Sequence, residues 1–409
     1  MTMRILFLSR WYPFPANNGA RLRILNLIKA LGGEYTVALV AFADAPVTEP
    51  ALAAMQALCD HVRVVPYRGF RPGSVQARLG FFSPTPRSVI DTFSPEMQAA
   101  VEQIAAAWQP DLVIASELDM LRYALAVKHV GRVLEELELA VLYEALQHAS
   151  WGAARLRKGL TWWKLERYLR NTLPAFDLVT VVSPREQELA QRVCPKGMPV
   201  QVVPNGADLA ALAQVGATPQ PGTLIYSGAL SFSANYDAVH YFLRDIFPLI
   251  LAQAPDTRLF ITGSTQGVAL DQLPQMPNVH FTGYLESVWP AVAASWVSVV
   301  PLRLGGGTRL KVIESLALGT PVVATAKGAE GLGLTADVEI AVADTPQHFA
   351  EKVLALLHDA DLRRHFSEHG RAAVQRFDWA MIGRDLNELL AGVVARRQLQ
   401  ALASEQRGS

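Results

Sequence analysis

Short apolar runs rich in β-branched residues alternate with helical patterns along almost the whole chain, and this alternation constrains the fold more than any other feature. The runs lie at 4–9, 36–42, 62–66, 112–115, 132–134 and 178–182, and again at 223–227, 258–262, 279–282, 297–301, 321–324 and 339–342. Between the first two runs, apolar residues from Leu22 to Leu31 recur at helical spacing. Strands separated by helices pair in parallel. We therefore expect an α/β protein built from two parallel sheets.

The length of 409 residues fits two large α/β domains and a closing segment. We expect a first domain over 1–205 and a second over 206–375. The charge-poor stretch 209–222 is rich in Ala, Gln, Pro and Gly, which indicates a linker. Residues 376–409 contain Trp379, Ile382 and Leu386 at helical spacing. For them we expect either an ordinary closing helix or one that crosses back to the first domain, with a frayed polar tail.

Composition excludes several classes of protein. Lys+Arg and Asp+Glu both number 37, so the chain has no net charge with which to attract nucleic acid. Two cysteines, Cys59 and Cys194, cannot make a structural zinc site or a disulfide scaffold. The apolar start before Arg10 is expected to be a strand rather than a signal peptide. The longest charge-poor stretches contain proline, so we expect a cytoplasmic protein, at most attached to the inner face of the membrane.

The segment 299–325 carries the clearest chemical signal. A strand is followed by three glycines, Gly305 to Gly307, and then by Thr308, which we expect to cap a helix over 309–318 that Gly319 ends. A glycine loop that leads from a parallel strand into a helix N-terminus is a typical place for phosphate groups. This segment therefore predicts a binding site for an anionic ligand.

Two cations stand at the start of that helix, where they oppose the helix dipole. Arg309 and Lys311 would be explained by a diphosphate that meets a guanidinium, an ammonium and backbone N–H groups together. The plain alternative is that Lys311 pairs with Glu314 one turn away while Arg309 is solvated. We favour the diphosphate, because the loop follows a strand end.

From Glu314 to Gly331 the sequence ESLALGTPVVATAKGAEG closely resembles the C-terminal signature of family-four retaining glycosyltransferases of the GT-B fold. Further segments resemble that family in the same order along the chain: Asn18–Arg21, Val203–Asp208, Tyr226–Leu230 and Phe281–Leu285. The resemblance implies two Rossmann-like domains that face each other across a cleft. It also implies transfer of a sugar from a UDP- or GDP-linked donor to a glycan, a lipid-linked or a small-molecule acceptor, with retention, without a metal and without a further cofactor. The family's usual setting is envelope or exopolysaccharide synthesis.

The resemblance assigns roles residue by residue. Glu314 would bind the donor ribose, Gly328 to Gly331 with Glu330 would face the transferred sugar, and Tyr284 and Leu285 would line the base pocket. The donor-binding set is Gly19, Asn205, Gly228, Tyr284, Leu285, Gly306, Gly307, Thr308, Glu314, Gly328, Glu330 and Gly331. Tyr284 could equally be a surface aromatic residue, and the glycines after strands could simply terminate them.

The chain departs from the family pattern at two places. Gly306 stands where family members carry the first of two glutamates, and the segment 231–237 lacks the usual phosphate-binding cations. We hypothesise that Arg309 and Lys311 replace that charge and stabilise the leaving diphosphate. In the first domain Glu138 is the candidate catalytic acid, beside Glu135 and the weaker His148; a solvated helix start is the alternative.

Residues 151–176 contain six basic residues and one acid, with Trp151, Trp162 and Trp163 among them. This mixture suits an anionic lipid surface, although a solvent-facing or acceptor-side helix would show it too. The expected partners are thus a nucleotide sugar, an acceptor and the membrane surface, and not nucleic acid.

Two other functions compete with the transferase. One is a catalytically silent subunit that only binds the nucleotide sugar, which Gly306 favours. The other is a nicotinamide-dependent dehydrogenase, because doubly wound sheets also bind dinucleotides, although the glycine fingerprint after the first strand is absent.

Overall fold

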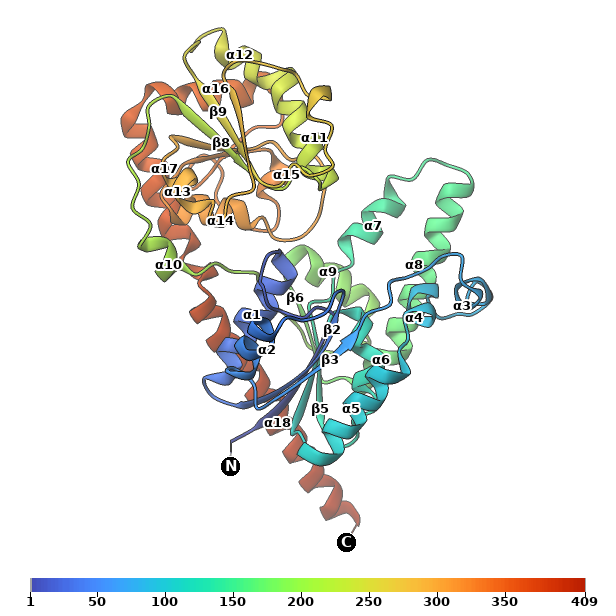
Figure 1. Cartoon of the computed structure of the whole chain (residues 1–409). Helices are drawn as coiled ribbons and strands as arrows, with labels where there is room; N and C mark the ends of the chain where they lie inside the picture. Colours follow the sequence, from blue (N-terminus) through green and yellow to red (C-terminus); the bar gives the residue numbers. More distant parts are fainter. Residues whose placement is uncertain (1, 409) are drawn as a thin grey trace. The chain divides into compact units, whose positions relative to one another are not determined.

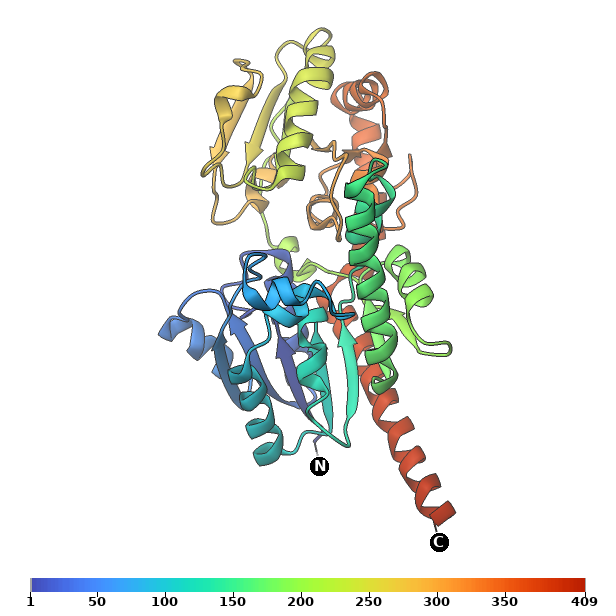
Figure 2. The same cartoon turned by 90° about the vertical axis from the view of Figure 1, so that its right-hand side faces the viewer.

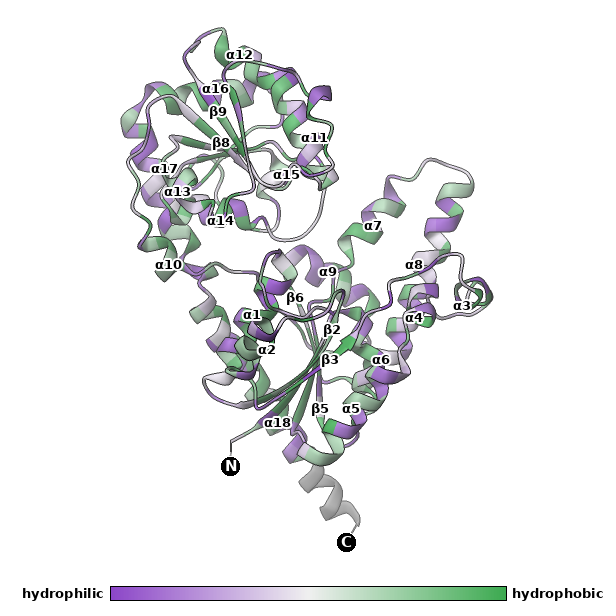
Figure 3. Cartoon of the chain, in the orientation of Figure 1, coloured by the Kyte–Doolittle hydropathy of each residue, from purple (hydrophilic) through white to green (hydrophobic). Residues whose placement is uncertain are grey.

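The computed structural model describes residues 2–408, with side chains described up to residue 399. The chain divides into two compact units, Met1–Pro204 with Ala380–Ser409, and Asn205–Trp379. Figures 1 and 2 show each unit as a sheet flanked by helices. The hydropathy colouring of Figure 3 places apolar residues along the strands of both sheets. The expected α/β class is confirmed.

The first unit contains a parallel sheet of seven strands in the order β3-β2-β1-β4-β5-β6-β7. Its strands are β1 (Arg4–Ser9), β2 (Thr36–Ala43), β3 (His61–Pro66), β4 (Leu112–Ser116), β5 (Gly131–Glu135), β6 (Leu178–Val181) and β7 (Val200–Val202). Its helices are α1 (Gly19–Gly32), α2 (Glu49–Gln56), α3 (Val75–Leu79), α4 (Arg87–Asp91), α5 (Pro95–Trp108), α6 (Leu121–Ala124), α7 (Ala140–Gln147), α8 (Ala153–Thr172), α9 (Pro184–Val193) and α18 (Trp379–Gly408), with 3₁₀ turns η1 (Leu118–Met120) and η2 (Leu173–Ala175).

The second unit contains a parallel sheet of six strands in the order β10-β9-β8-β11-β12-β13. Its strands are β8 (Thr223–Ser227), β9 (Arg258–Thr262), β10 (Val279–Gly283), β11 (Val297–Val300), β12 (Val322–Ala324) and β13 (Ala341–Val342). Its helices are α10 (Leu209–Ala213), α11 (Ser233–Tyr241), α12 (Phe247–Leu251), α13 (Trp289–Ala293), α14 (Leu310–Ala317), α15 (Ala326–Ala329), α16 (Pro346–His358) and α17 (Ala360–Ala373). A π-helical turn η3 (Phe242–Ile246) and 3₁₀ turns η4 (Leu270–Gln272) and η5 (Val374–Phe377) complete it.

All twelve runs that the sequence marks as strands form strands, and only the short β7 was not expected. The central strands are buried on both faces, as parallel strands between helices must be, and they therefore form continuous apolar runs, whereas the edge strands β3 and β10 are partly exposed. The stretch 209–222 was wrongly interpreted as a linker. It belongs to the second unit, where it begins with α10 and buries Leu209 and Leu212.

Helix α18 packs within the first unit along its apolar stripe. A Cβ at Gly383 would lie 2.5 Å from the Ala30 Cβ of α1, and Arg397 pairs with Asp177 at 2.9 Å. Figure 2 shows this long helix beside the sheet of the first unit.

Candidate active site

In each sheet the chain order reverses next to the first strand, between β1 and β4 in one unit and between β8 and β11 in the other. Loops that leave the carboxyl ends of two such strands diverge to opposite faces and open a crevice, where ligands of doubly wound sheets bind. Each unit thus has one such crevice, and candidate residues lie at or beside it.

At the crevice of the second unit the loop after β8 and the loop after β9 approach each other closely. Gly228 follows β8 and Gly263 follows β9, both with positive φ angles of 156° and 119°. A Cβ on Gly263 would lie 2.5 Å from the carbonyl oxygen of Gly228, and one on Gly228 would lie 2.7 Å from the Lys311 Nζ. Only glycine allows these loops to approach each other and the lysine so closely.

Lys311, in the first turn of α14, reaches across this crevice. Its Nζ donates to Tyr226 Oη at 3.1 Å and to Asn235 Oδ1 at 3.0 Å, and it lies 4.3 Å from the Tyr226 ring centroid. The Tyr226 hydroxyl in turn donates to Asn235 Oδ1 at 2.8 Å. The ammonium is therefore positioned by β8 and α11 rather than by the neighbouring Glu314.

Burial of Lys311, with a smaller contribution from the Arg309 charge, lowers the pKa of its amine to about 7. An amine with this pKa is half-charged at neutral pH. It gains a full charge when an anion approaches, so the position suits a phosphate ligand.

Arg309 is 7 % exposed and lies folded onto the glycine loop. Its two Nη atoms donate to the carbonyl oxygens of Gly306 at 2.6 Å and Gly305 at 2.8 Å, and its Nε donates to the Lys327 carbonyl at 3.2 Å. The guanidinium thus holds the shape of the loop from Gly305 to Gly307. Its direct role toward a diphosphate stays a prediction.

The sequence predicts that Thr308 caps the helix, and this prediction is wrong. Arg309 is the capping position of α14 and its side chain makes no capping bond, whereas the Thr308 hydroxyl accepts from Asn205 Nδ2 at 3.1 Å. This contact, between residues that are distant in sequence, joins two predicted donor-binding residues.

Glu314 lies on α14 and accepts from Trp289 Nε1 of α13 at 3.1 Å. Burial raises the pKa of its carboxyl, and the Trp289 bond and the Lys311 charge only partly oppose this. The Glu314 carboxyl accepts one hydrogen bond from the Trp289 indole, and its remaining lone pairs could accept hydrogen bonds from hydroxyl groups of a ligand.

The remaining donor-binding candidates surround this cluster or lie at its edges. Gly328 packs so tightly that a Cβ would lie 2.4 Å from the Val300 carbonyl. Glu330 pairs with Lys327 at 2.6 Å, and Gly331 has a positive φ of 81°. Tyr284, 73 % exposed, and the half-buried Leu285 follow β10 at the edge of the sheet.

In the first unit a buried ionic cluster underlies the crevice. Arg23 of α1 is fully buried; its Nη2 lies 2.6 Å from Glu135 Oε1, and its Nε lies 3.6 Å from Glu136 Oε2. It also donates to the carbonyl oxygens of Val203 and Pro204 at 2.9 and 3.0 Å. The arginine thus ties the ends of β5 and β7 to α1.

Glu117 and Glu136, the residues that immediately follow β4 and β5, have positive φ angles of 70° and 59°. With ψ at 164°, Glu117 occupies a region that is otherwise almost restricted to glycine, and such strain concentrates at functional sites. Burial and the charges of Asp119 and Glu135 raise the pKa of Glu117 to about 8, against the opposing effect of Arg10.

Arg10, which follows β1, faces the same crevice. It is 8 % exposed, pairs with Asp44 at 2.8 Å and lies with its guanidinium carbon 3.2 Å from the Tyr67 ring centroid. Its Nη1 is buried without a hydrogen-bond partner. A buried donor of this kind is satisfied when a polar ligand binds.

Of the sequence-predicted residues of the first unit, Glu135 lies at the centre of this cluster as the partner of Arg23, whereas Glu138, Gly19 and His148 lie outside the ion pairs that form it. Glu138 is exposed; partial loss of water around its carboxyl raises its pKa, although Arg23 opposes this. Gly19 begins α1 after the Asn18 cap. His148, at the end of α7, bonds through Nδ1 to the Glu144 carbonyl at 2.9 Å.

Sequence reasoning missed Tyr226, Asn235, Trp289, Arg10 and Glu117. Two of them could have been found, because Arg10 and Glu117 are the first polar side chains after apolar strands. The others matter only through contacts between distant segments. Among the side chains that the structure describes, up to residue 399, no group of three or more His, Cys, Asp or Glu could hold a metal ion. No helix within residues 2–408 is long and apolar enough to cross a bilayer.

Two family models match the chain. The model described as Glycosyltransferase Family 4 matches residues 17–211, and the model described as Glycosyl transferases group 1 matches residues 221–359. Together they span most of both units.

Among curated proteins, the phosphatidyl-myo-inositol mannosyltransferase of Mycobacterium tuberculosis is 28 % identical over 218 residues, which is 48 % of this chain and 56 % of that protein. The match thus spans little more than half the length of this relative.

Among solved structures, two share the fold across nearly their whole length. HepE from Anabaena, solved with UDP and glucose, has a TM-score of 0.64 at 18 % identity and covers 95 % of this chain and 100 % of its own. Sucrose-phosphate synthase from Thermosynechococcus elongatus has a TM-score of 0.66 at 19 % identity, covering 96 % and 100 %. At such identities the likeness concerns the fold alone.

Proposed function

The chain belongs to the group 1, family-four-like glycosyltransferases of the GT-B fold, and from this premise we propose that it transfers a sugar from a UDP- or GDP-linked donor to a glycan, lipid-linked or small-molecule acceptor. Retention of configuration and independence from a metal are part of the proposal, as is a role in envelope or exopolysaccharide synthesis at the inner face of the membrane. Family membership removes the dehydrogenase from consideration.

One observation carries the proposal: a buried amine, Lys311 Nζ, is held by Tyr226 and Asn235 against the Gly228 turn that follows β8, at the crevice of the second sheet. When the bond between the anomeric carbon and the diphosphate oxygen breaks, negative charge grows on the diphosphate. The Lys311 charge and the N-terminus of α14 would stabilise that charge, with Arg309 holding the loop in place. These groups are already positioned, so they need no costly reorganisation during the reaction.

The donor ribose would then be held by Glu314. Its buried carboxyl is oriented by Trp289, and a vicinal diol offers two donors to such a group. HepE, which shares the fold, was solved with UDP and glucose, and this supports a UDP-linked donor as one candidate.

The experiment measures donor binding and transfer separately. Thermal shift with UDP, GDP and ADP and their sugars should select one base. Lys311→Ala should lower turnover with saturating donor by roughly 10²–10³, the scale for losing one preorganised charge stabiliser. Lys352→Ala, which removes an exposed lysine paired with Asp337 in the same unit, is the matched control.

A silent nucleotide-sugar-binding subunit remains the second candidate, because Gly306 replaces the family's first acid. It would show selective thermal stabilisation by one nucleotide, with neither transfer nor donor hydrolysis. Wild-type turnover in Lys311→Ala would contradict the transferase mechanism described above.

A further inference from the structure

Helix α7, the turn after it and the first half of α8 form a helical hairpin that buries almost nothing. From residue 140 to residue 163 only Ala149 is buried. The second half of α8 differs, because Lys164, Leu165, Leu169 and Thr172 are buried there. The first half of the segment 151–176 therefore leaves its apolar side chains uncovered, whereas the second half buries one face.

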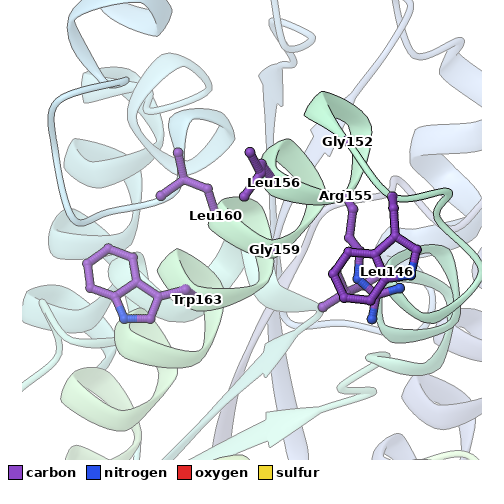
Figure 4. Close-up of a pocket in the computed structure, with 8 residues that line it drawn as sticks. Leu146, Gly152, Arg155, Leu156, Gly159, Leu160 and Trp163 are labelled. Atoms are coloured by element: carbon purple, nitrogen blue, oxygen red, sulfur yellow. The ribbon is translucent and has the colours of Figure 1, made fainter.

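The hairpin carries an apolar pocket of about 570 Å³ on its surface. Leu146 of α7 and Leu156, Leu160 and Trp163 of α8 line it (Figure 4), and Trp151 in the turn between the two helices is a further lining residue. Trp151 is 88 % exposed and Leu156 is 77 % exposed. Large apolar side chains gathered at one exposed place mark a site that another molecule covers.

Basic residues accompany this pocket on α8. Arg155, which lines the pocket, lies with its guanidinium carbon 4.5 Å from the Trp151 ring centroid, and Arg157 and Lys158 follow it in the sequence. Residues 151–163 contain no acidic residue. An apolar pocket with cations on one of its two helices complements a molecule with an apolar chain and an anionic head.

A second exposed apolar segment continues the surface. Val75 and Leu79 lie one turn apart on α3 at 71 % and 66 % exposure, and Phe82 is 87 % exposed. Lys164, the residue after the pocket's Trp163, donates to the carbonyl oxygens of Gly80 at 3.1 Å and Phe81 at 2.7 Å. The structure thus fixes residues 75–82 to α8 beside the pocket.

We propose that residues 146–163 and 75–82 form one lipid-docking surface for an anionic phospholipid leaflet, in which the α7–α8 pocket takes a hydrocarbon tail and Arg155, Arg157 and Lys158 meet the phosphate groups. This surface adds a membrane partner to the proposed function. It depends on the proposed function only in assuming that the acceptor is lipid-linked. Charge complementarity decides between a leaflet and a protein partner: tryptophans beside arginines suit the boundary between acyl chains and phosphates.

The test is co-sedimentation of the full chain with vesicles of about 30 mol % phosphatidylglycerol in phosphatidylcholine, compared with pure phosphatidylcholine. The wild type should bind the anionic vesicles and lose binding at high salt. Each cation near the surface is worth roughly five-fold in partitioning, so the triple variant Arg155→Gln, Arg157→Gln, Lys158→Gln should bind about 100-fold more weakly. The triple variant Arg185→Gln, Arg192→Gln, Lys196→Gln removes equal charge elsewhere in the first unit and should bind like the wild type.

A second readout tests the hydrocarbon tail. Phosphatidylcholine with brominated acyl chains, mixed into the anionic vesicles, should quench tryptophan emission in the wild type and clearly less in Trp151→Phe. Equal quenching, or equal binding of the two triple variants, would overturn the inference. The inference would also be overturned if the wild-type protein did not bind anionic vesicles. A concentration-dependent dimer that Trp151→Phe abolishes would overturn it as well. Thermal stabilisation by a nucleotide, measured on the same preparation, would show that the proposed function survives such a failure.

Discussion

The charge of Lys311 makes donor binding depend on pH in a way that can be calculated. In the free protein burial holds the amine pKa at about 7, whereas its ordinary value is 10.5. A diphosphate in contact with the amine favours the charged form and moves the pKa back toward the ordinary value. At pH values where the free amine is neutral, donor binding is therefore accompanied by the uptake of a proton.

The magnitude follows from these two pKa values. Between about pH 6.5 and pH 8.5 the charged fraction of the free amine falls steeply, while that of the bound amine stays near one. If the bound pKa is fully restored, donor affinity should fall by about 25-fold over this range, and about 0.9 proton should be taken up per donor at pH 8. A nucleoside diphosphate sugar is the right probe, because its phosphates do not titrate in this range.

The assay is titration calorimetry in two buffers of different ionisation enthalpy, with Lys311→Met compared against Lys352→Met. The Lys311 variant should bind weakly with a flat pH profile, and the Lys352 variant should behave like the wild type. On the same two pKa values the buried amine costs the unbound protein up to about 4 kcal/mol near pH 7, and this cost disappears as pH rises toward 10.5, so unbound Lys311→Met should be more stable than the wild type at neutral pH. An unchanged pH profile in Lys311→Met would refute the reasoning.

Three further predictions rest on other contacts. Gly263→Ala should destabilise the protein by about 3 kcal/mol or more, because its Cβ meets the Gly228 carbonyl, whereas Gly267→Ala, with a similar positive φ and open space, should cost about 1 kcal/mol; urea denaturation with and without donor compares them. Arg23→Met should cost about 3–5 kcal/mol, since it leaves Glu135 and Glu136 buried without their partner, and the control Arg68→Met, which breaks the exposed pair with Glu96, should cost under 1 kcal/mol; equal midpoints would contradict this. Glu117→Gln should be more stable than the wild type by up to about 4 kcal/mol near pH 8, because a raised carboxyl pKa costs stability as pH rises from about 4.5 to 8; a parallel pH dependence of unfolding in both proteins would argue against the raised value.

The sheet architecture could be predicted because parallel strands are buried on both faces and therefore form continuous apolar runs. Strand β7 was missed because its three residues alternate between buried and exposed positions, as an edge strand does. Thr308 was misjudged for a different reason: local sequence predicts a cap, but Asn205, distant in the chain, takes the hydroxyl.

The role of the candidate residues in donor binding stays a prediction, and their contacts were only partly foreseen. The structure brings Gly228 and Lys311 together at the strand end after β8, and Glu314 follows Lys311 on α14. What the sequence could not reveal is that Tyr226 and Asn235 hold the Lys311 amine, or that Arg309 holds its own loop. Such pairings depend on how β8, α11 and α14 pack, which no local pattern encodes.

The most direct test of the central claim is a crystal structure with UDP or GDP bound. We predict that the β-phosphate lies within hydrogen-bond distance of the Lys311 Nζ, above the Gly228 turn and beside the loop from Gly305 to Gly307. Density for the diphosphate at another place, with the lysine still bonded only to Tyr226 and Asn235, would contradict the account.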